Sequence, residues 1–322
     1  MRAIAVEAPG GPEVLTAAEV DLDELGDNEV RVSVDVIGVN YWDVMQRRGI
    51  VPLPASRIPG VEGAGRVSAV GPGVNDLAPG ARVAWSKLQG SYAEAVQGDR
   101  AWFVPIPDDV TQEQAAATLM QGTTAWYLAH EVVPLVAGDV AVVLAAAGGV
   151  GHLLCQLLVG RDVTVVGIVG SAAKASVAHA AGASAVLVDS DDVVGRLREH
   201  VPHGAAVVFD GNGGPDALRD LAMLGSRGTA VYYGTTAGPL PTLDLGDLTA
   251  GSLAVRRVRG ADYVGDPAAW RTAAVAVLAQ AATGGIRAHI DSSQPLSEAA
   301  RQHERMESRS SAGKLLLDVE ST

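Results

Sequence analysis

The sequence is poor in cysteine, in positive charge and in long apolar runs. Cys155 is the only cysteine among 322 residues, which excludes an intrachain disulfide and a cysteine-rich metal site. No apolar run reaches the roughly 18 residues that a membrane-spanning helix requires. The first residues also lack the long apolar segment of a secretion signal. We therefore expect a cytoplasmic protein with no membrane partner, in which Cys155 is a small buried residue.

Positive charge is scarce relative to negative charge. The chain has 24 lysines and arginines against 37 aspartates and glutamates, a net charge of −13, and the basic residues are scattered along it. This balance argues against nucleic acid or an anionic membrane surface as the main partner. A composition of 48% apolar and 19% charged residues excludes a disordered chain, and the length allows two domains.

The first part of the chain, to about residue 110, has short runs in which apolar and polar residues alternate. Prolines and glycines separate these runs, which lie at 3–6, 29–36, 65–70, 81–85 and 92–96. Alternation with a period of two, interrupted by frequent turns, predicts a small antiparallel, barrel-like β domain.

The pattern changes at Thr111, where an N-cap signal precedes a helix expected over 115–132. Strands and helices then alternate. The strands are expected at 140–144, 163–169, 185–188, 206–209, 229–233 and 253–258, and two of the helices at 174–181 and 215–224. Continuous apolar strands joined by helices predict a parallel sheet covered on both faces, which is the doubly wound (Rossmann) dinucleotide-binding fold.

The end of the chain has a long helix expected over 267–283, a second short helix and a final strand over 313–319. A final strand that follows helices can return to the N-terminal β domain, which would make the nucleotide domain an insertion. We expect one domain over 1–120 plus 266–322 and a dinucleotide-binding domain over 121–265.

A loop of small residues joins the first strand of the α/β region to its helix. Residues 145–151 read Ala-Ala-Ala-Gly-Gly-Val-Gly, between an apolar strand and an amphipathic stretch. The first N–H groups of a helix lack partners, and here nothing bulky blocks their approach by a pyrophosphate. The sequence therefore predicts a dinucleotide seat formed by Ala147, Gly148, Gly149, Val150 and Gly151.

Several motifs occur in the order found in one known family. They are residues 38–43 (Gly-Val-Asn-Tyr-Trp-Asp), 59–65, 70–74, 80–83, 114–117, 122–125, the glycine loop and 307–309. On these motifs the chain resembles the medium-chain dehydrogenase/reductase superfamily, and within it the zinc-free quinone oxidoreductase branch that includes zeta-crystallin. The resemblance implies an α/β chain in which the Rossmann domain is inserted into a GroES-like β-barrel domain.

The residues that bind zinc in other members of this superfamily are missing. Zinc alcohol dehydrogenases have a cysteine where this chain has Asn40 and a histidine where it has Val61. A catalytic zinc needs three protein ligands, and Glu62 alone does not make a site. We expect no bound metal. Without a Lewis acid, hydride is most easily delivered to an electron-poor acceptor, such as a quinone or another conjugated carbonyl.

The resemblance also assigns residues to the reaction. The equivalents of Asn40 and Asp43 lie near the nicotinamide and the substrate in the family, although Asn40 could simply be a turn residue and Asp43 a helix N-cap. Thr124 falls in a segment that contacts the nicotinamide, or is an ordinary helical residue. Arg257 either lines the substrate cleft or lies at a subunit interface. The segment Tyr233–Thr235, with Gly234 at its centre, is expected around the nicotinamide.

Cofactor choice is predicted from charge. NAD sites usually have an acidic residue at the end of the second strand, whereas here the segment from Gly170 and Ser171 to Lys174 has no carboxylate. The family pairs the cofactor 2′-phosphate with a lysine and a C-terminal arginine, which correspond to Lys174 and Arg309. These residues predict NADPH. Asp189 replaces a tyrosine that also contacts this phosphate, and its charge would oppose the phosphate unless it turns to solvent.

The sequence is compatible with three functions. The first is a zinc-independent, NADPH-dependent reductase of quinones or conjugated carbonyls. The second is an enoyl-thioester reductase of a polyketide or fatty-acid pathway, since residues 44–48 lack the tyrosine of close quinone oxidoreductases. The third is a structural or regulatory NADPH-binding protein. The family further implies a homodimer, formed by pairing of the edge strand 253–258 with its copy.

Overall fold

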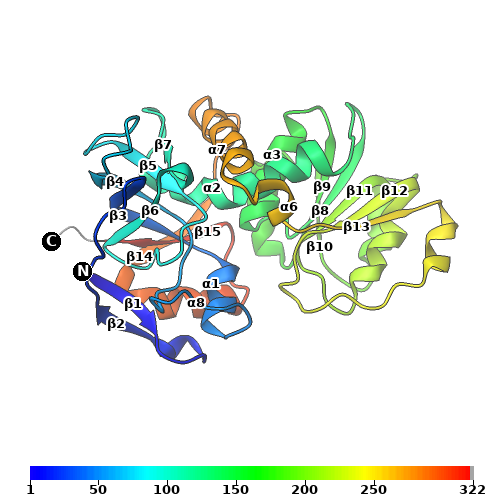
Figure 1. The fold of residues 1–322 in the computed structure, drawn as a ribbon. Coiled ribbons are helices and arrows are strands. Elements are labelled where there is room, and N and C mark those ends of the chain that lie inside the picture. The colour runs from blue at the N-terminus through cyan, green and yellow to red at the C-terminus, as the bar shows by residue number, and fades with distance from the viewer. Residues whose placement is uncertain (320–322) are drawn as a thin grey trace. The chain divides into compact units, whose positions relative to one another are not determined.

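The computed structural model describes residues 1–319, and the chain divides into two compact units. Unit 1 comprises Met1–Met120 and Pro267–Thr322, and unit 2 comprises Gln121–Asp266. Figure 1 shows unit 1 in blue, cyan and orange to red, and unit 2 mainly in green and yellow. The two ends of the chain therefore fold together, and the middle forms the second unit.

Unit 1 is built on an extended sheet with the strand order β14-β15-β3-β4-β5-β7, and β6 pairs with β3 beside this path. A separate hairpin pairs β1 with β2. The strands are β1 (Arg2–Val6), β2 (Leu15–Glu19), β3 (Glu29–Val39), β4 (Gly63–Val70), β5 (Arg82–Trp85), β6 (Ala95–Asp99), β7 (Val104–Pro105), β14 (Ile290–Pro295) and β15 (Lys314–Asp318).

The last strand returns to the N-terminal β sheet, as the sequence predicts. β15 pairs antiparallel with the end of β3, where Leu315 lies opposite Val39 and Leu317 opposite Ile37. These four side chains are buried, so the return strand closes the apolar core of unit 1. β14 was not expected, because its residues Ile-Asp-Ser-Ser-Gln-Pro show no apolar alternation; the first five are partly exposed and Pro295 is exposed.

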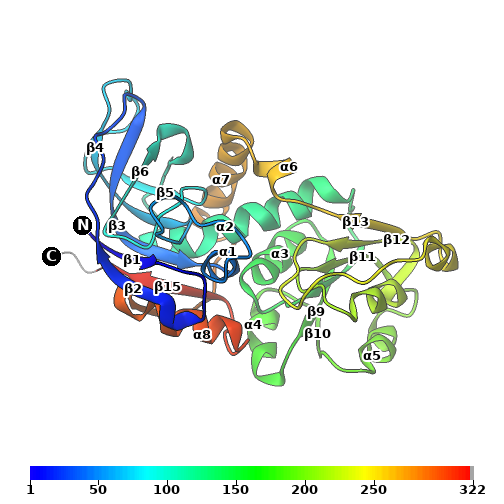
Figure 2. The same cartoon turned by 60° about the horizontal axis from the view of Figure 1, so that its bottom comes forward.

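Figure 2 labels the α-helices that belong wholly or partly to unit 1. They are α1 (Tyr41–Arg47), α7 (Pro267–Ala282) and α8 (Ala299–Glu307), and α2 (Gln112–Tyr127) begins in unit 1 and ends in unit 2. The helix expected over 115–132 stops being α-helical at Tyr127, and a π-helical turn over Leu128–Val132 follows. α1 follows β3 directly, so the end of a buried strand positions its first turn.

Unit 2 contains the expected parallel sheet. Its strands follow the order β10-β9-β8-β11-β12-β13, and every neighbouring pair is parallel. The strands are β8 (Val140–Leu144), β9 (Thr164–Val169), β10 (Ala185–Val188), β11 (Ala205–Asp210), β12 (Leu224–Tyr232) and β13 (Ala254–Arg257). The order reverses between β8 and β11, and in such sheets ligands bind outside the carboxyl ends of the strands at this switch point.

Helical segments cover the sheet of unit 2 and bury its continuous apolar strands. They are α3 (Gly149–Val159), α4 (Ala175–Ala180) and α5 (Val193–His200), whereas the short α6 (Ala261–Val264) follows β13. The segment expected as a helix over 215–224 is instead a 3₁₀ helix, Ala217–Met223, because Leu224 already begins β12. In the part of the chain that the structure describes, no helix has both the length and the apolarity to cross a membrane.

Candidate functional site

The glycine loop lies at the switch point of the unit 2 sheet. It follows β8, and α3 begins at Gly149 with Gly148 as its N-cap. Ala145 adopts a left-handed conformation (φ 51°) and accepts a 2.7 Å hydrogen bond from the N–H of Gly148, which turns the chain sharply. A Cβ at Gly151 would lie 2.3 Å from the Ala145 carbonyl oxygen, so a side chain there would push the helix away from the loop. The first N–H groups of α3 thus remain accessible for a phosphate.

Other residues expected to bind the cofactor lie at the same edge of the sheet. Gly170 and Ser171 follow β9, Lys174 ends the next short helical turn, and Tyr233–Thr235 follows β12. The carboxyl ends of parallel strands share one edge, so these segments and the glycine loop lie along one side of unit 2. A Cβ built on Gly170 would meet no atom within 4 Å, which leaves open space beside the end of β9.

Thr124 and Arg257 lie around one tyrosine of unit 2. The side chain of Thr124 hydrogen-bonds Tyr127, and the Arg257 charge also acts on this phenol. Burial raises the pKa of Tyr127 to about 12, so its hydroxyl stays protonated at neutral pH. The ring stacks on Tyr263 with centroids 4.6 Å apart. Arg257 also donates to the carbonyl oxygen of Tyr232 at 3.0 Å.

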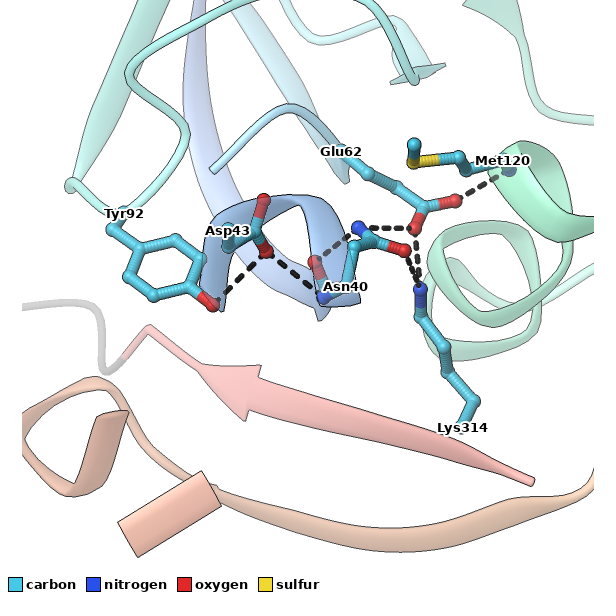
Figure 3. Close-up of polar contacts among 7 residues, drawn as sticks. Asn40, Asp43, Glu62, Tyr92, Met120 and Lys314 are labelled. Carbon is cyan, nitrogen blue, oxygen red and sulfur yellow. Dashed lines mark hydrogen bonds and ion pairs between the residues drawn. The ribbon is translucent and has the colours of Figure 1, made fainter. Parts of the chain in front are cut away.

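Asn40 lies in unit 1, in a buried network with two charged residues (Figure 3). The Lys314 ammonium lies 2.6 Å from Oε2 of Glu62 and donates to Oδ1 of Asn40 at 2.8 Å. Nδ2 of Asn40 donates to Gly38 and to Oε2 of Glu62, at 3.0 and 3.2 Å. Oε1 of Glu62 accepts the backbone N–H of Met120 at 2.6 Å. The Asn40 amide is therefore held on both its nitrogen and its oxygen.

Asp43 lies one turn further along α1, in a second buried group. Its Oδ2 accepts the backbone N–H of Asn40 at 2.9 Å, so Asn40 is the N-cap and Asp43 closes the first turn of the helix. Oδ2 also accepts the Tyr92 hydroxyl at 3.1 Å, and Nε2 of His303 lies 2.9 Å from the same hydroxyl. Because the hydroxyl donates to Asp43, His303 must donate from Nε2.

Burial controls the charge of this second group. It raises the pKa of Asp43 to about 7, although the Asn40 N–H, the Lys314 charge and the Tyr92 hydroxyl act in the opposite direction. Burial, together with the Arg47 charge, lowers the pKa of His303 to about 3. His303 is therefore neutral at physiological pH, and Asp43 exchanges a proton close to neutrality. A group that titrates near pH 7 in this position is suited to proton transfer.

The raised pKa of Asp43 predicts a pH-dependent stability. Asp43 titrates near 3.8 when unfolded and about 7 when folded, so its contribution is fully present below pH 3.8 and is lost as the pH rises through 7. Asp43→Asn keeps an oxygen acceptor but cannot ionise. We expect the free energy of unfolding of the variant, relative to the native chain, to increase by up to about 4 kcal/mol between pH 4 and 8. Urea unfolding at a series of pH values measures this difference, and parallel curves for the two proteins would contradict it.

Arg47 connects α1 to the end of α8. It is buried and donates from Nη2 to both carboxylate oxygens of Glu307, at 2.8 and 2.9 Å. Glu307 is the last residue of α8, and the exposed Arg309 follows with a left-handed backbone (φ 55°). The ion pair thus fixes the segment from which Arg309 projects. The ion pair also neutralises the charge of Arg47, which is one of the positive charges in residues 44–48.

A cavity of about 620 Å³ lies at the far end of α1 from Asn40. Gln46 lines it together with residues 49–55, and the charged Glu7 and Arg57 contribute to its wall. Gln46 itself is buried and donates to Oε1 of Gln89 at 2.7 Å. The volume of the cavity is within the range of small-molecule sites.

Most of the side-chain partners in unit 1 were not predicted from the sequence. Lys314 shows one signal, because a lysine at the start of the apolar strand 314–318 requires a partner if it is buried. Tyr92 and His303 show no such signal, since they are 211 residues apart.

Cys155 is buried as expected, and burial raises the pKa of its thiol to about 12. Within residues 1–319, no group of three or more His, Cys, Asp or Glu side chains is arranged to hold a metal ion.

Two known domain families match the chain. Residues 26–129 match the alcohol dehydrogenase GroES-like domain, and residues 149–281 match a domain described as zinc-binding dehydrogenase. Together with the parallel sheet of unit 2, these matches confirm the predicted fold class: a Rossmann domain inserted into a GroES-like domain.

Full-length relatives are also found. A quinone oxidoreductase of Pseudomonas aeruginosa is 35% identical over 317 residues, covering 96% of this chain and 97% of the relative. A 2-haloacrylate reductase of a Burkholderia species is 29% identical and covers 98% of each chain. The crystal structure of Escherichia coli quinone oxidoreductase complexed with NADPH has a TM-score of 0.91 at 33% identity, and the match covers 99% of this chain and 100% of that one.

Proposed function

Because the chain belongs to the quinone oxidoreductase branch of the medium-chain dehydrogenase/reductase superfamily, we propose that it reduces a quinone or another conjugated carbonyl without zinc. It is an oxidoreductase whose cofactor is NADPH. When bound, NADPH supplies the hydride. The small residues after β8 and the accessible N terminus of α3 fit its pyrophosphate.

The Lys314–Glu62–Asn40 network is the observation that supports a zinc-independent reaction. Asn40 and Val61 stand where zinc relatives have their cysteine and histidine ligands. Both oxygens of Glu62 are already engaged, one by the Lys314 ammonium and the other by the Met120 N–H. The charge of Glu62 is therefore compensated by the chain itself, and none of these side chains is prepared to coordinate a cation.

A conjugated acceptor suits these residues. Its carbonyl is already electron-poor, so the chain needs to position the substrate and supply a proton rather than polarise a carbonyl with a metal. Asp43 is our candidate for the proton-exchanging group, with Tyr92 and His303 holding its carboxyl in place. Asn40, Thr124 and Arg257 are proposed to line the reaction site, as the family resemblance implies.

A substrate panel tests this proposal. NADPH absorbance is followed with a naphthoquinone, an enone, an acrylate and a crotonyl thioester, each with and without a metal chelator. We expect turnover of at least one conjugated acceptor at a rate that the chelator does not change. Loss of activity with the chelator, restored by zinc, would contradict the proposal.

The same substrate panel separates the proposed reaction from its nearest alternative, the reduction of an enoyl thioester. The likeness to a 2-haloacrylate reductase favours an acceptor conjugated to a carboxyl group. The cavity of about 620 Å³ beside Gln46 could accept part of a larger substrate. Activity with the crotonyl thioester but not with the quinone would identify an enoyl-thioester reductase.

We also propose a cytoplasmic homodimer. β13 is at the edge of the unit 2 sheet, next to β12, and three of its four residues are exposed. Pairing of this strand with its copy would satisfy an open row of backbone groups. The molar mass of the protein in solution distinguishes a dimer from a monomer.

A further inference from the structure

Asp189 lies beside the end of the second strand of the nucleotide-binding sheet. It directly follows β10, and its backbone N–H donates at 2.8 Å to the carbonyl oxygen of Val169, the last residue of β9. The residues that follow β9 are Gly170 and Ser171, where the chain has no carboxylate of its own. An acidic side chain at the end of the second strand hydrogen-bonds the ribose hydroxyl of NADH and disfavours the 2′-phosphate of NADPH. Asp189 follows the neighbouring strand, and its negative charge disfavours binding of the NADPH 2′-phosphate.

Arg219 compensates this charge. Its Nη2 lies 2.7 Å from Oδ1 of Asp189 and 2.8 Å from Oδ2. The two side chains remain 30% and 34% exposed, so solvent and ligands can reach the pair. Arg219 comes from the 3₁₀ helix between β11 and β12, 30 residues further along the chain.

The other carboxyl groups near Arg219 are less effective competitors for its charge. Asp216 and Asp220 both act on the guanidinium, but Asp216 is exposed, so solvent screens its charge. Asp220 is fully buried, and burial, with the charge of Asp210, raises its pKa to about 8. At pH 7 Asp220 is mostly protonated, whereas Asp189 accepts a direct hydrogen bond from Arg219.

We propose that Arg219 is a cofactor-specificity residue, which allows NADPH to bind by neutralising Asp189 at the adenosine end of the site. The inference rests on the proposed position of the 2′-phosphate beside Gly170–Lys174. Arg219 acts through Asp189, so it is needed only while the carboxylate is present. Without Arg219, Asp189 repels the phosphate and can accept the 2′-hydroxyl of NADH.

Binding measurements on four proteins test this role. The dissociation constants of NADPH and NADH are measured at pH 7 by nicotinamide fluorescence for the native chain, Arg219→Gln, Asp189→Asn and the double variant. We expect Arg219→Gln to weaken NADPH binding about tenfold to a hundredfold and NADH binding little or not at all. Asp189→Asn should not weaken NADPH binding, and the double variant should return the ratio of the two constants close to that of the native chain.

Two further variants serve as controls. Arg227→Gln removes an exposed arginine from the amino-terminal half of β12, on the same unit, and should change neither constant. Arg219→Lys keeps a positive charge and should retain most of the preference. Equal weakening of both cofactors by Arg219→Gln, or a double variant that still discriminates against NADPH, would overturn the proposal. The binding measurement uses no substrate. Its result therefore stays valid even if the chain fails to reduce any substrate of the panel, and the two proposals can fail separately.

Discussion

Replacement of Lys314 by methionine is expected to destabilise the protein by about 3–5 kcal/mol, because it leaves the charge of Glu62 buried without a counter-charge. The side chains of Lys314 and Glu62 are only 2% and 0% exposed, and their charged atoms lie 2.6 Å apart. Removing both charges should be much less costly than removing one. The double variant Lys314→Met with Glu62→Gln is therefore expected to recover most of the lost stability.

Urea unfolding followed by tryptophan fluorescence measures this effect in the relevant unit, since four of the five tryptophans belong to unit 1 (Trp42, Trp85, Trp102 and Trp270). The matched control is Arg2→Met. Arg2 forms an ion pair with Glu94, but its side chain is 56% exposed, so the loss should stay below about 1 kcal/mol. Similar small losses for Lys314→Met and Arg2→Met would show that the buried pair has no special role.

Replacement of Lys174 or Arg309 by alanine is expected to raise the KM for NADPH far more than the KM for NADH. Each residue is proposed to form a charge-assisted hydrogen bond with the 2′-phosphate, which NADH lacks. The loss of one such bond corresponds to a factor of about ten to a hundred in binding. We expect that factor for NADPH and little change for NADH in steady-state assays with both cofactors.

Arg66→Ala is the control for these variants, because Arg66 is an exposed residue of β4 in unit 1. It should leave both constants unchanged. Equal increases for the two cofactors in Lys174→Ala and Arg309→Ala would mean that these residues do not recognise the 2′-phosphate.

Local patterns predicted unit 2 well. β8 and β10 begin and end where the apolar runs do, and the glycine loop follows β8 directly. Each strand, turn and helix of a parallel α/β unit is encoded in a short stretch, and apolar strands buried on both faces are easy to recognise. The errors occurred where two elements meet without a turn signal, as at Leu224, where the 3₁₀ helix and β12 adjoin.

Side-chain partners were not predictable in the same way. Asn40 and Asp43 were singled out from a motif, but their contacts with Lys314 and Tyr92 span 274 and 49 residues. The opposing charge of Asp189 was visible in the sequence, whereas its compensation by Arg219 was not. No periodicity relates such pairs, because their distance along the chain is set by the path of the intervening elements.

The sequence by itself determined the parallel sheet of unit 2, the loop of small residues after β8 and the absence of the cysteine and histidine that zinc relatives use. These features depend on residue type and on short-range spacing. The tertiary structure alone decided that Glu62 is neutralised by Lys314, that Asp43 titrates near pH 7 and that Arg219 faces Asp189. Those properties depend on burial and on the distance between charges, which arise only when strands such as β3 and β15 are brought together.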